Sequence, residues 1–168
     1  MIATTDKDAY RFADIIVVDV PFEADKPGIS RALDMVMSNE PDMHKWLEAA
    51  SVDRVAQMYG EDGDMSLKVF TLAIEQIAES MKEDALVIIE TTVPPGTTDL
   101  LAMPILERGR AARGITSSPM VAHSYERVMP GKDYLKSIYD YPRQISGIDE
   151  RSLLAAKTFF ESINGCVS

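Results

Sequence analysis

The sequence predicts an α/β fold, a parallel, doubly wound sheet with helices flanking it. Two β-branched runs and the amphipathic segment between them lead to this prediction. Runs that are apolar without alternation are typical of strands buried on both faces of a parallel sheet. A helix between two such strands makes the crossover that parallel neighbours need. The 168 residues can form a core of their own, and we expect a single domain over 1–168.

The two predicted strands are the apolar runs at 13–21 and 85–91, each of which leads into a proline. Between them, apolar residues spaced by three and four predict a helix that Asp64 or Ser66 can cap. These apolar residues are Leu67, Phe70, Ile74, Ile77 and Met81. The stretch that precedes this helix, 26–63, is interpreted as a helical insertion.

The remaining elements follow the second strand. A helix is predicted from Thr97 or Thr98 to about Ala112, divided or kinked by Pro104, which lacks a backbone donor, and ended by Gly114. The segments expected after it are a short strand near Ile115–Ser117, a polar loop over Ser118–Lys132, a strand over Arg143–Gly147 and a last helix that stops at Asn164-Gly165. The apolar face of that helix consists of Leu153, Ala156, Phe160 and Ile163.

Composition narrows the classes of partner. The net charge of −10 argues against nucleic acid and anionic membranes, because both are bound through clustered Lys and Arg. A single cysteine, Cys166, cannot form an internal disulfide, and the apolar runs are too short to span a bilayer. His44 and His123 have no neighbours at metal-ligand spacing, so no metal is expected. We expect a cytoplasmic protein.

Ligands of open parallel sheets bind beyond the carboxyl ends of the strands, which directs attention to the loops there. Thr91 and Thr92 stand at a strand end beside a proline-stiffened turn, where they can form a ligand edge or simply finish the strand. Glu126 lies in a later loop, next to Arg127. Its carboxylate can act as a general base or be an ordinary solvated side chain. The residue types alone leave both alternatives open.

Four segments, in this order, resemble the UDP-glucose/GDP-mannose dehydrogenase family. Ala13–Pro21 is similar to its aDvviiaVP strand, and Thr91–Thr98 to STVPPGTT with Thr in place of Ser. Ser124–Lys132 is similar to SPERVxPGK with Tyr125 in place of Pro, and Pro142–Gly147 to pdRviiGG. The resemblance covers most of the chain outside 26–63. It implies the second half of a Rossmann-like, NAD-binding domain, a partial sheet that lacks the first βαβ portion.

The family's reaction is the oxidation of the C6 alcohol of a nucleotide sugar, here a UDP-sugar, to a carboxylate with NAD, through a thioester on a cysteine. By resemblance Glu126 corresponds to the glutamate, and Thr92 to the threonine that holds the water, in hydrolysis of that thioester. The resemblance also implies two sets of binding residues. The cofactor side would consist of Val20, Pro21, Thr91 and Thr92, and the sugar side of Glu126, Arg127, Val128 and Gly131.

The GxGxxG turn that cradles the cofactor pyrophosphate does not occur in this sequence. Cys166 comes too early to be the family's nucleophile, and a packing role suits it better. We therefore expect residues 1–168 alone to be inactive and to bind NAD weakly or not at all. The expected partners are a nucleotide sugar and further copies of the chain.

Two other readings stay open. One is a non-catalytic binding or regulatory domain derived from the same fold. The other is a different NAD-dependent dehydrogenase, such as the hydroxyisobutyrate type, against which the VPPGTT and ERVMPG segments speak.

Overall fold

The computed structural model describes residues 6–20, 65–93, 96–126 and 131–163, with the side chains of 65–68 left aside. The predicted insertion at 26–63 lies outside these ranges. The chain groups into two compact units. The first, which we call the sheet unit, comprises Met1–Asp19, Ser80–Thr92 and Ile115–Ser168; the second, the helix unit, comprises Val20–Glu79 and Val93–Gly114. The expectation of a single domain stays a prediction.

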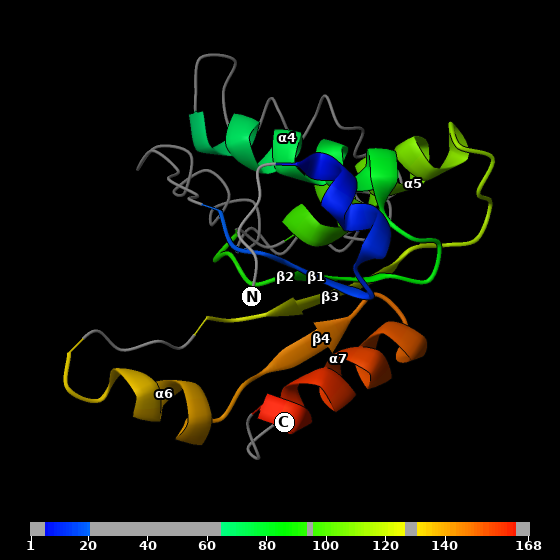
Figure 1. Cartoon of the computed structure of the whole chain (residues 1–168). Helices are drawn as coiled ribbons and strands as arrows, with labels where there is room; N and C mark the ends of the chain where they lie inside the picture. Colours follow the sequence, from blue (N-terminus) through cyan, green and yellow to red (C-terminus); the bar gives the residue numbers. More distant parts are fainter. Residues whose placement is uncertain (1–5, 21–64, 94–95, 127–130, 164–168) are drawn as a thin grey trace, which may run out of the picture. The chain divides into compact units, whose positions relative to one another are not determined.

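The sheet has four strands in the order β1-β2-β3-β4 (Figure 1). They are β1 (Ile15–Val18), β2 (Leu86–Ile89), β3 (Met120–Ser124) and β4 (Ile145–Gly147). The first three are parallel, as predicted, and β4 runs antiparallel to β3. The chain leaves the end of β3 and enters β4 at the same edge of the sheet, so the two strands run in opposite directions. The start of β4 therefore lies where β1, β2 and β3 end.

The expected strand near Ile115–Ser117 is wrong. The strand is β3, which begins at Met120, inside the stretch expected to be a polar loop. Pro119 precedes it and has no N–H to give to a ladder, so pairing begins only after that residue. Two short helices were not anticipated. They are the 3₁₀ helix η1 (Lys7–Phe12), which Asp6 caps, and α6 (Tyr134–Asp140).

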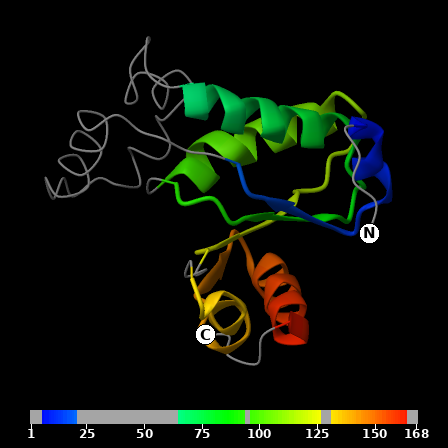
Figure 2. The same ribbon diagram turned by 60° about the vertical axis from the view of Figure 1, so that its left-hand side comes forward.

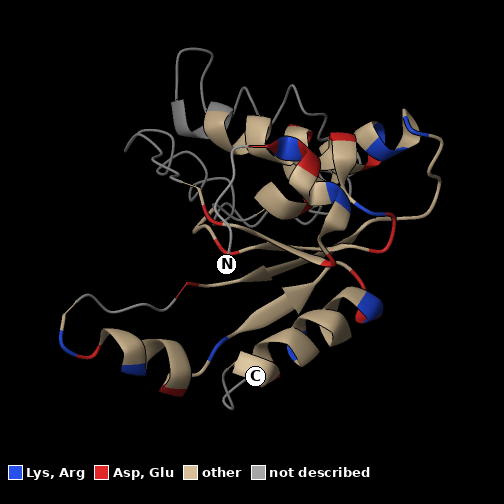
Figure 3. Ribbon diagram, in the orientation of Figure 1, with Lys and Arg blue, Asp and Glu red and all other residues tan. Residues whose placement is uncertain are grey.

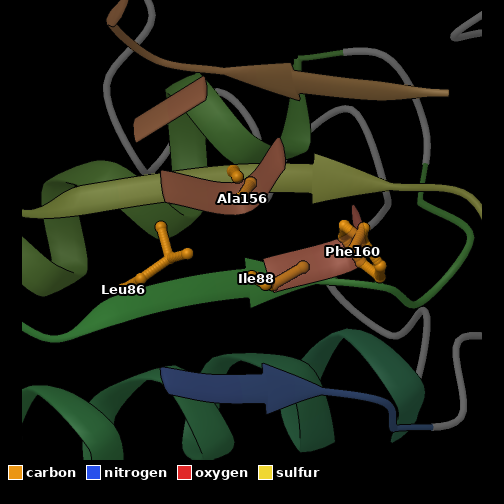
Figure 4. Close-up of a cluster of buried hydrophobic side chains, with 5 residues drawn as sticks. Leu86, Ile88, Ala156 and Phe160 are labelled. Carbon is orange, nitrogen blue, oxygen red and sulfur yellow. The ribbon is translucent and has the colours of Figure 1, made fainter. Parts of the chain in front are cut away.

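The core of the sheet unit lies between the sheet and α7 (Glu150–Ile163), which packs on β2, β3 and β4 (Figure 2). Figure 4 shows Leu86 and Ile88 of β2 beside Ala156 and Phe160 of the helix. The expected inward face is confirmed for Ala156 and Phe160. Leu153 and Ile163 are instead 37% and 41% exposed, so they flank the contact.

One side of β1 is less covered than the other. Ile16 and Val18 are buried, whereas Ile15 and Val17 are 37% and 42% exposed. Residues paired in a parallel register face the same side, so Ile15 and Val17 lie on the face that α7 covers over the other strands. Among the described residues β1 has one sheet neighbour, β2, and forms an edge.

The helix unit contains most of α4 (Met65–Ser80), a π-helical turn η2 (Thr98–Ala102) and α5 (Met103–Ala111). The predicted helix between the first two strands is confirmed. Of its two predicted caps, Asp64 lies outside the described residues and Ser66 lies within α4. Pro104 stands in the first turn of α5, as a division at this proline predicts. Thr97, one of the two residues predicted to begin this segment, is the N-cap residue of η2 and makes no side-chain cap bond. Gly114 takes a φ of 78° just beyond the helix, which confirms its role as a stop.

Candidate functional site at the carboxyl rim of the sheet

The carboxyl ends of β2 and β3 and the start of β4 meet at one edge of the sheet unit, which we call the rim. It comprises residues 90–92, 125–126 and 143–144. The ends are level because Ile89, the last residue of β2, pairs with His123. In Figure 3 the strands carry no charged colour, and the charges of this unit lie on helices or beyond strand ends. The strands thus carry no charged residue, and the charged groups nearest to them stand beyond their ends.

Thr91 and Thr92 have different surroundings, although they are adjacent. Thr91 is 5% exposed, and its hydroxyl donates to the carbonyl of Val18 at 3.4 Å. The backbone N–H groups of Glu90 and Thr91 reach the same carbonyl at 2.9 and 3.2 Å. Thr91 therefore fastens the end of β2 to β1. Thr92 is exposed at the rim.

Glu126 reaches the same rim from the neighbouring strand. Ile89 of β2 and His123 of β3 are register partners. Thr92 lies three residues after Ile89, and Glu126 lies three residues after His123. The carboxylate-bearing residue is half-buried. Thr92 and Glu126 thus follow the carboxyl ends of adjacent parallel strands, at the same edge of the sheet.

His123 is a rim-side residue that the sequence analysis set aside. Its ring meets Tyr125 edge to face, with centroids 5.1 Å apart, and its Nδ1 is buried without a hydrogen-bond partner. Burial lowers the pKa of His123 below its ordinary value of 6.5, and a hydrogen bond to the backbone of Ile89 opposes that shift. The Nδ1 of His123 is therefore a buried polar atom without a hydrogen-bond partner.

Glu90 and Arg143 form a buried ion pair at the rim, with side chains 16% and 8% exposed. The guanidinium also lies over the ring of Phe160, 5.0 Å from its centroid. Arg143 falls in the Pro142–Gly147 segment, but nothing in the sequence links it to Glu90. The pair depends on the direction of β4, which the sequence analysis did not predict.

The other predicted site residues are placed as follows. Val20 is half-buried two residues after β1, and Gly131 is exposed with a φ of 115° before α6. Pro21, Arg127 and Val128 lie outside the described residues. Within the described ranges no group of three or more His, Cys, Asp or Glu is arranged to hold a metal ion, and no helix is both long and apolar enough to cross a membrane.

Parallel strands that end at a common rim are the arrangement of dinucleotide-binding domains, whose ligand lies beyond the strand ends. Thr92 is exposed just beyond one of these strand ends. The pyrophosphate of a dinucleotide is usually held by the amides of a glycine-rich turn and helix start, and none of the described rim residues form such a turn.

The sequence and the fold define a Rossmann-type NAD-binding domain of a dehydrogenase. Residues 55–164, about two thirds of the chain, match the model of the UDP-glucose/GDP-mannose dehydrogenase family, NAD binding domain. The chain belongs to that family, and NAD is the cofactor of this domain.

Named relatives agree with the family. The UDP-N-acetyl-D-mannosamine dehydrogenase of Pyrococcus horikoshii is 38% identical over 103 residues, which are 61% of this chain and 23% of that protein. The enzyme of the same name from Methanocaldococcus jannaschii is 38% identical over 90 residues, 54% of this chain and 19% of the relative. The matched segments thus span about a quarter or less of the length of these relatives.

Solved structures show the same fold. A structure of the Pyrococcus horikoshii UDP-D-ManNAc dehydrogenase superposes with a TM-score of 0.64 at 25% identity, covering 98% of this chain and 30% of that one. GDP-mannose dehydrogenase from Pseudomonas aeruginosa gives 0.63 at 15% identity, with the same coverage, and supports the fold alone. The predicted Rossmann-like class is confirmed.

Proposed function

We propose that residues 1–168 form part of the NAD-binding domain of a nucleotide-sugar 6-dehydrogenase, which oxidises the C6 alcohol of a UDP-sugar to a carboxylate. The observation that supports this proposal is that Thr92 and Glu126 follow the carboxyl ends of adjacent parallel strands, each three residues after one member of the register pair Ile89–His123. The names of the relatives make UDP-N-acetyl-D-mannosamine the first substrate to test.

The two rim residues divide the work of the hydrolytic step. The hydroxyl of Thr92 orients a water molecule. The carboxylate of Glu126 takes a proton from that water as the water oxygen bonds to the acyl carbon of the thioester. The carbon–sulfur bond of the thioester then breaks, leaving the sugar carboxylate and the enzyme thiol. NAD, when bound, accepts the hydride in the oxidative steps. Its contacts are proposed at Val20, Pro21 and Thr91–Thr92, and those of the sugar at 126–128 and Gly131.

Thr91 has a narrower part in this proposal than Thr92. Its hydroxyl already donates to the backbone of Val18, and its side chain is buried. We infer that it acts on the cofactor side by holding the ends of β1 and β2 together. Its backbone remains a candidate contact.

A chimera tests the proposal. Residues 84–147 replace the matching segment of the Pyrococcus horikoshii enzyme, and NADH formation is measured with UDP-N-acetyl-D-mannosamine. We expect an active chimera in which Thr92→Ala and Glu126→Gln each lower kcat by about 10²–10⁴-fold. Thr158→Ala and Glu161→Gln, introduced by extending the transplanted segment to 163, are the matched controls because both side chains are exposed on α7. A folded chimera without activity, or a Glu126→Gln chimera with an unchanged kcat, refutes the assignment.

The isolated chain gives a second test. We expect no NADH formation from residues 1–168 and NAD binding weaker than the micromolar range, measured by calorimetry. Micromolar affinity would contradict this part of the proposal. Specific ligand binding by the chain together with an inactive, folded chimera would favour the non-catalytic binding domain. Sedimentation analysis tests the predicted self-association.

A further inference from the structure

The ion pair between Glu90 and Arg143 joins strands that are not neighbours. Glu90 directly follows β2, Arg143 lies two residues before β4, and β3 runs between these strands in the sheet. Neighbouring strands are separated by ~4.8 Å, so the pair reaches across about 10 Å of sheet. Glutamate and arginine side chains are long enough to meet over that distance.

Both side chains lie on the face of the sheet that α7 covers. Glu90 is two residues after Ile88, which packs in the α7 cluster, and side chains alternate along a strand. Arg143 is two residues before Ile145, which packs against the same cluster, and its guanidinium lies over Phe160 of α7. The helix thus limits the positions that the guanidinium can take.

The middle strand carries a small residue at the crossing. Ser124 pairs with Ile145, so it lies on the same face, between the strands that bear Glu90 and Arg143. It is fully buried, and its Oγ has no hydrogen-bond partner. A hydroxyl that makes no bond there does not explain the choice of serine, whereas the lack of bulk does, because a larger side chain would stand in the path of the pair.

We propose that Glu90 and Arg143 are positioning residues that act as a brace across β3 and thereby hold Thr92 and Glu126 in place at the rim. Thr92 is two residues from one end of the brace, and Glu126 is two residues beyond the serine that the brace crosses. The inference rests on the proposed function for its catalytic meaning. The mechanical claim stands on the geometry alone.

The test is amide hydrogen exchange of the full chain by NMR, combined with the methyl resonance of Thr92. The reporters at the rim are the N–H groups of Glu90 and Thr91, both bonded to the carbonyl of Val18; the reporters inside β2 are Val87 and Ile88. In Glu90→Gln and Glu90→Asp we expect the rim amides to exchange about tenfold faster while the internal amides change little, since local opening is separable from global unfolding.

The glutamine variant removes the charge at constant size, and the aspartate variant keeps the charge but shortens the reach. Ser124→Leu should reproduce the effect without altering either charge, and Ser124→Ala should behave as wild type. Asp14→Asn is the matched control, because Asp14 forms an exposed ion pair with Lys82 at the opposite edge of the sheet. The chemical shift of the Thr92 methyl group should change in both Glu90 variants and in Ser124→Leu. It should stay unchanged in Ser124→Ala and Asp14→Asn.

A purely stabilising pair predicts a different result. Equal acceleration of rim and internal amides, or a Glu90→Asp variant indistinguishable from wild type, overturns the brace. If Glu90→Gln fails to fold, Glu90→Asp and Ser124→Leu still decide the question. Introduced into the chimera described above, Glu90→Asp should lower kcat at least tenfold with little change in KM. Unchanged kcat with faster rim exchange would keep the brace and discredit the catalytic rim.

Discussion

Replacing Gly147 with alanine offers a sharp test of how α7 is seated on the sheet. A Cβ at this position would lie 2.3 Å from the backbone N of Leu153 and 2.8 Å from both its Cα and the carbonyl oxygen of Asp149. All three atoms belong to backbone, so no side-chain rotation relieves the overlap. The first turn of α7 has to move away from the end of β4.

That movement would strain specific hydrogen bonds. The carboxylate of Asp149 accepts from the N–H of Ser152 at 2.7 Å, and the hydroxyl of Ser152 accepts from the N–H of Val121 at 3.2 Å. Overpacking costs about 1–3 kcal/mol, and each of the two weakened hydrogen bonds loses part of the about 0.5–1.5 kcal/mol that a whole bond contributes. We expect Gly147→Ala to lower the free energy of unfolding by about 2–4 kcal/mol, which corresponds to a decrease in Tm of roughly 5–15 °C for a chain of this size.

Urea unfolding followed by circular dichroism measures this difference. Gly114→Ala is the control, because a Cβ there meets nothing within 4 Å and the only cost is its φ of 78°. That strain is worth about 1–2 kcal/mol. If Gly147→Ala is no more destabilising than Gly114→Ala, the described contact between the end of β4 and the first turn of α7 is wrong.

Three further outcomes are expected. Phe160→Ala should lower the free energy of unfolding, measured by heat or urea, by about 3–5 kcal/mol. A nearly fully buried ring is removed from the cluster, and the guanidinium of Arg143 loses its aromatic partner. A smaller loss than that of Leu154→Ala, on the exposed face of α7, would contradict this prediction. Burial lowers the pKa of His123, so protonation should disfavour the folded state and the wild type should lose stability as the pH falls below 6.5. The His123→Gln variant should lose less stability over the same pH range. A ¹H NMR titration that gives His123 a pKa at or above 6.5 would refute the reasoning. The side-chain and backbone hydrogen bonds from Ser152 lower the pKa of Asp149 in the folded state. The stability that this carboxylate contributes is therefore present above its unfolded pKa of about 4 and is lost as the pH falls through its lower pKa in the folded state. The Asp149→Asn variant should flatten that part of the curve of stability against pH.

The elements that the sequence predicts correctly are those whose pattern is local. β1, β2 and α4 stand out because β-branched runs and a spacing of three and four are properties of neighbouring residues. β3 was misplaced because Met120–Ser124 mixes apolar residues with histidine and serine, and because Pro119 delays the start of pairing. Its identity as a strand depends on burial against β2, which is a property of the fold.

The candidate site divides in the same way. Thr92 and Glu126 could be selected because both follow predicted strands and fall in recognisable motifs. Glu90 and Arg143 are 53 residues apart, and their pairing requires both the strand order and the reversed direction of β4. The sequence gives no signal for His123, since the lack of a partner for its buried Nδ1 is visible only in the structure.

The sheet unit is assembled from three separated stretches of chain, and this arrangement bears on the order of folding. Ser124 and Ile145, paired between β3 and β4, are 21 positions apart, whereas Ile15 and Leu86, paired between β1 and β2, are 71 apart. Closing a longer loop costs more chain entropy before any contact compensates for it, and distant pairings slow folding. β1 should therefore be the last strand to join the sheet during folding. Newly synthesised chains would pass through a three-stranded intermediate in which β2, Leu86–Ile89, is an unpaired edge strand. That intermediate would be the stage most vulnerable to aggregation.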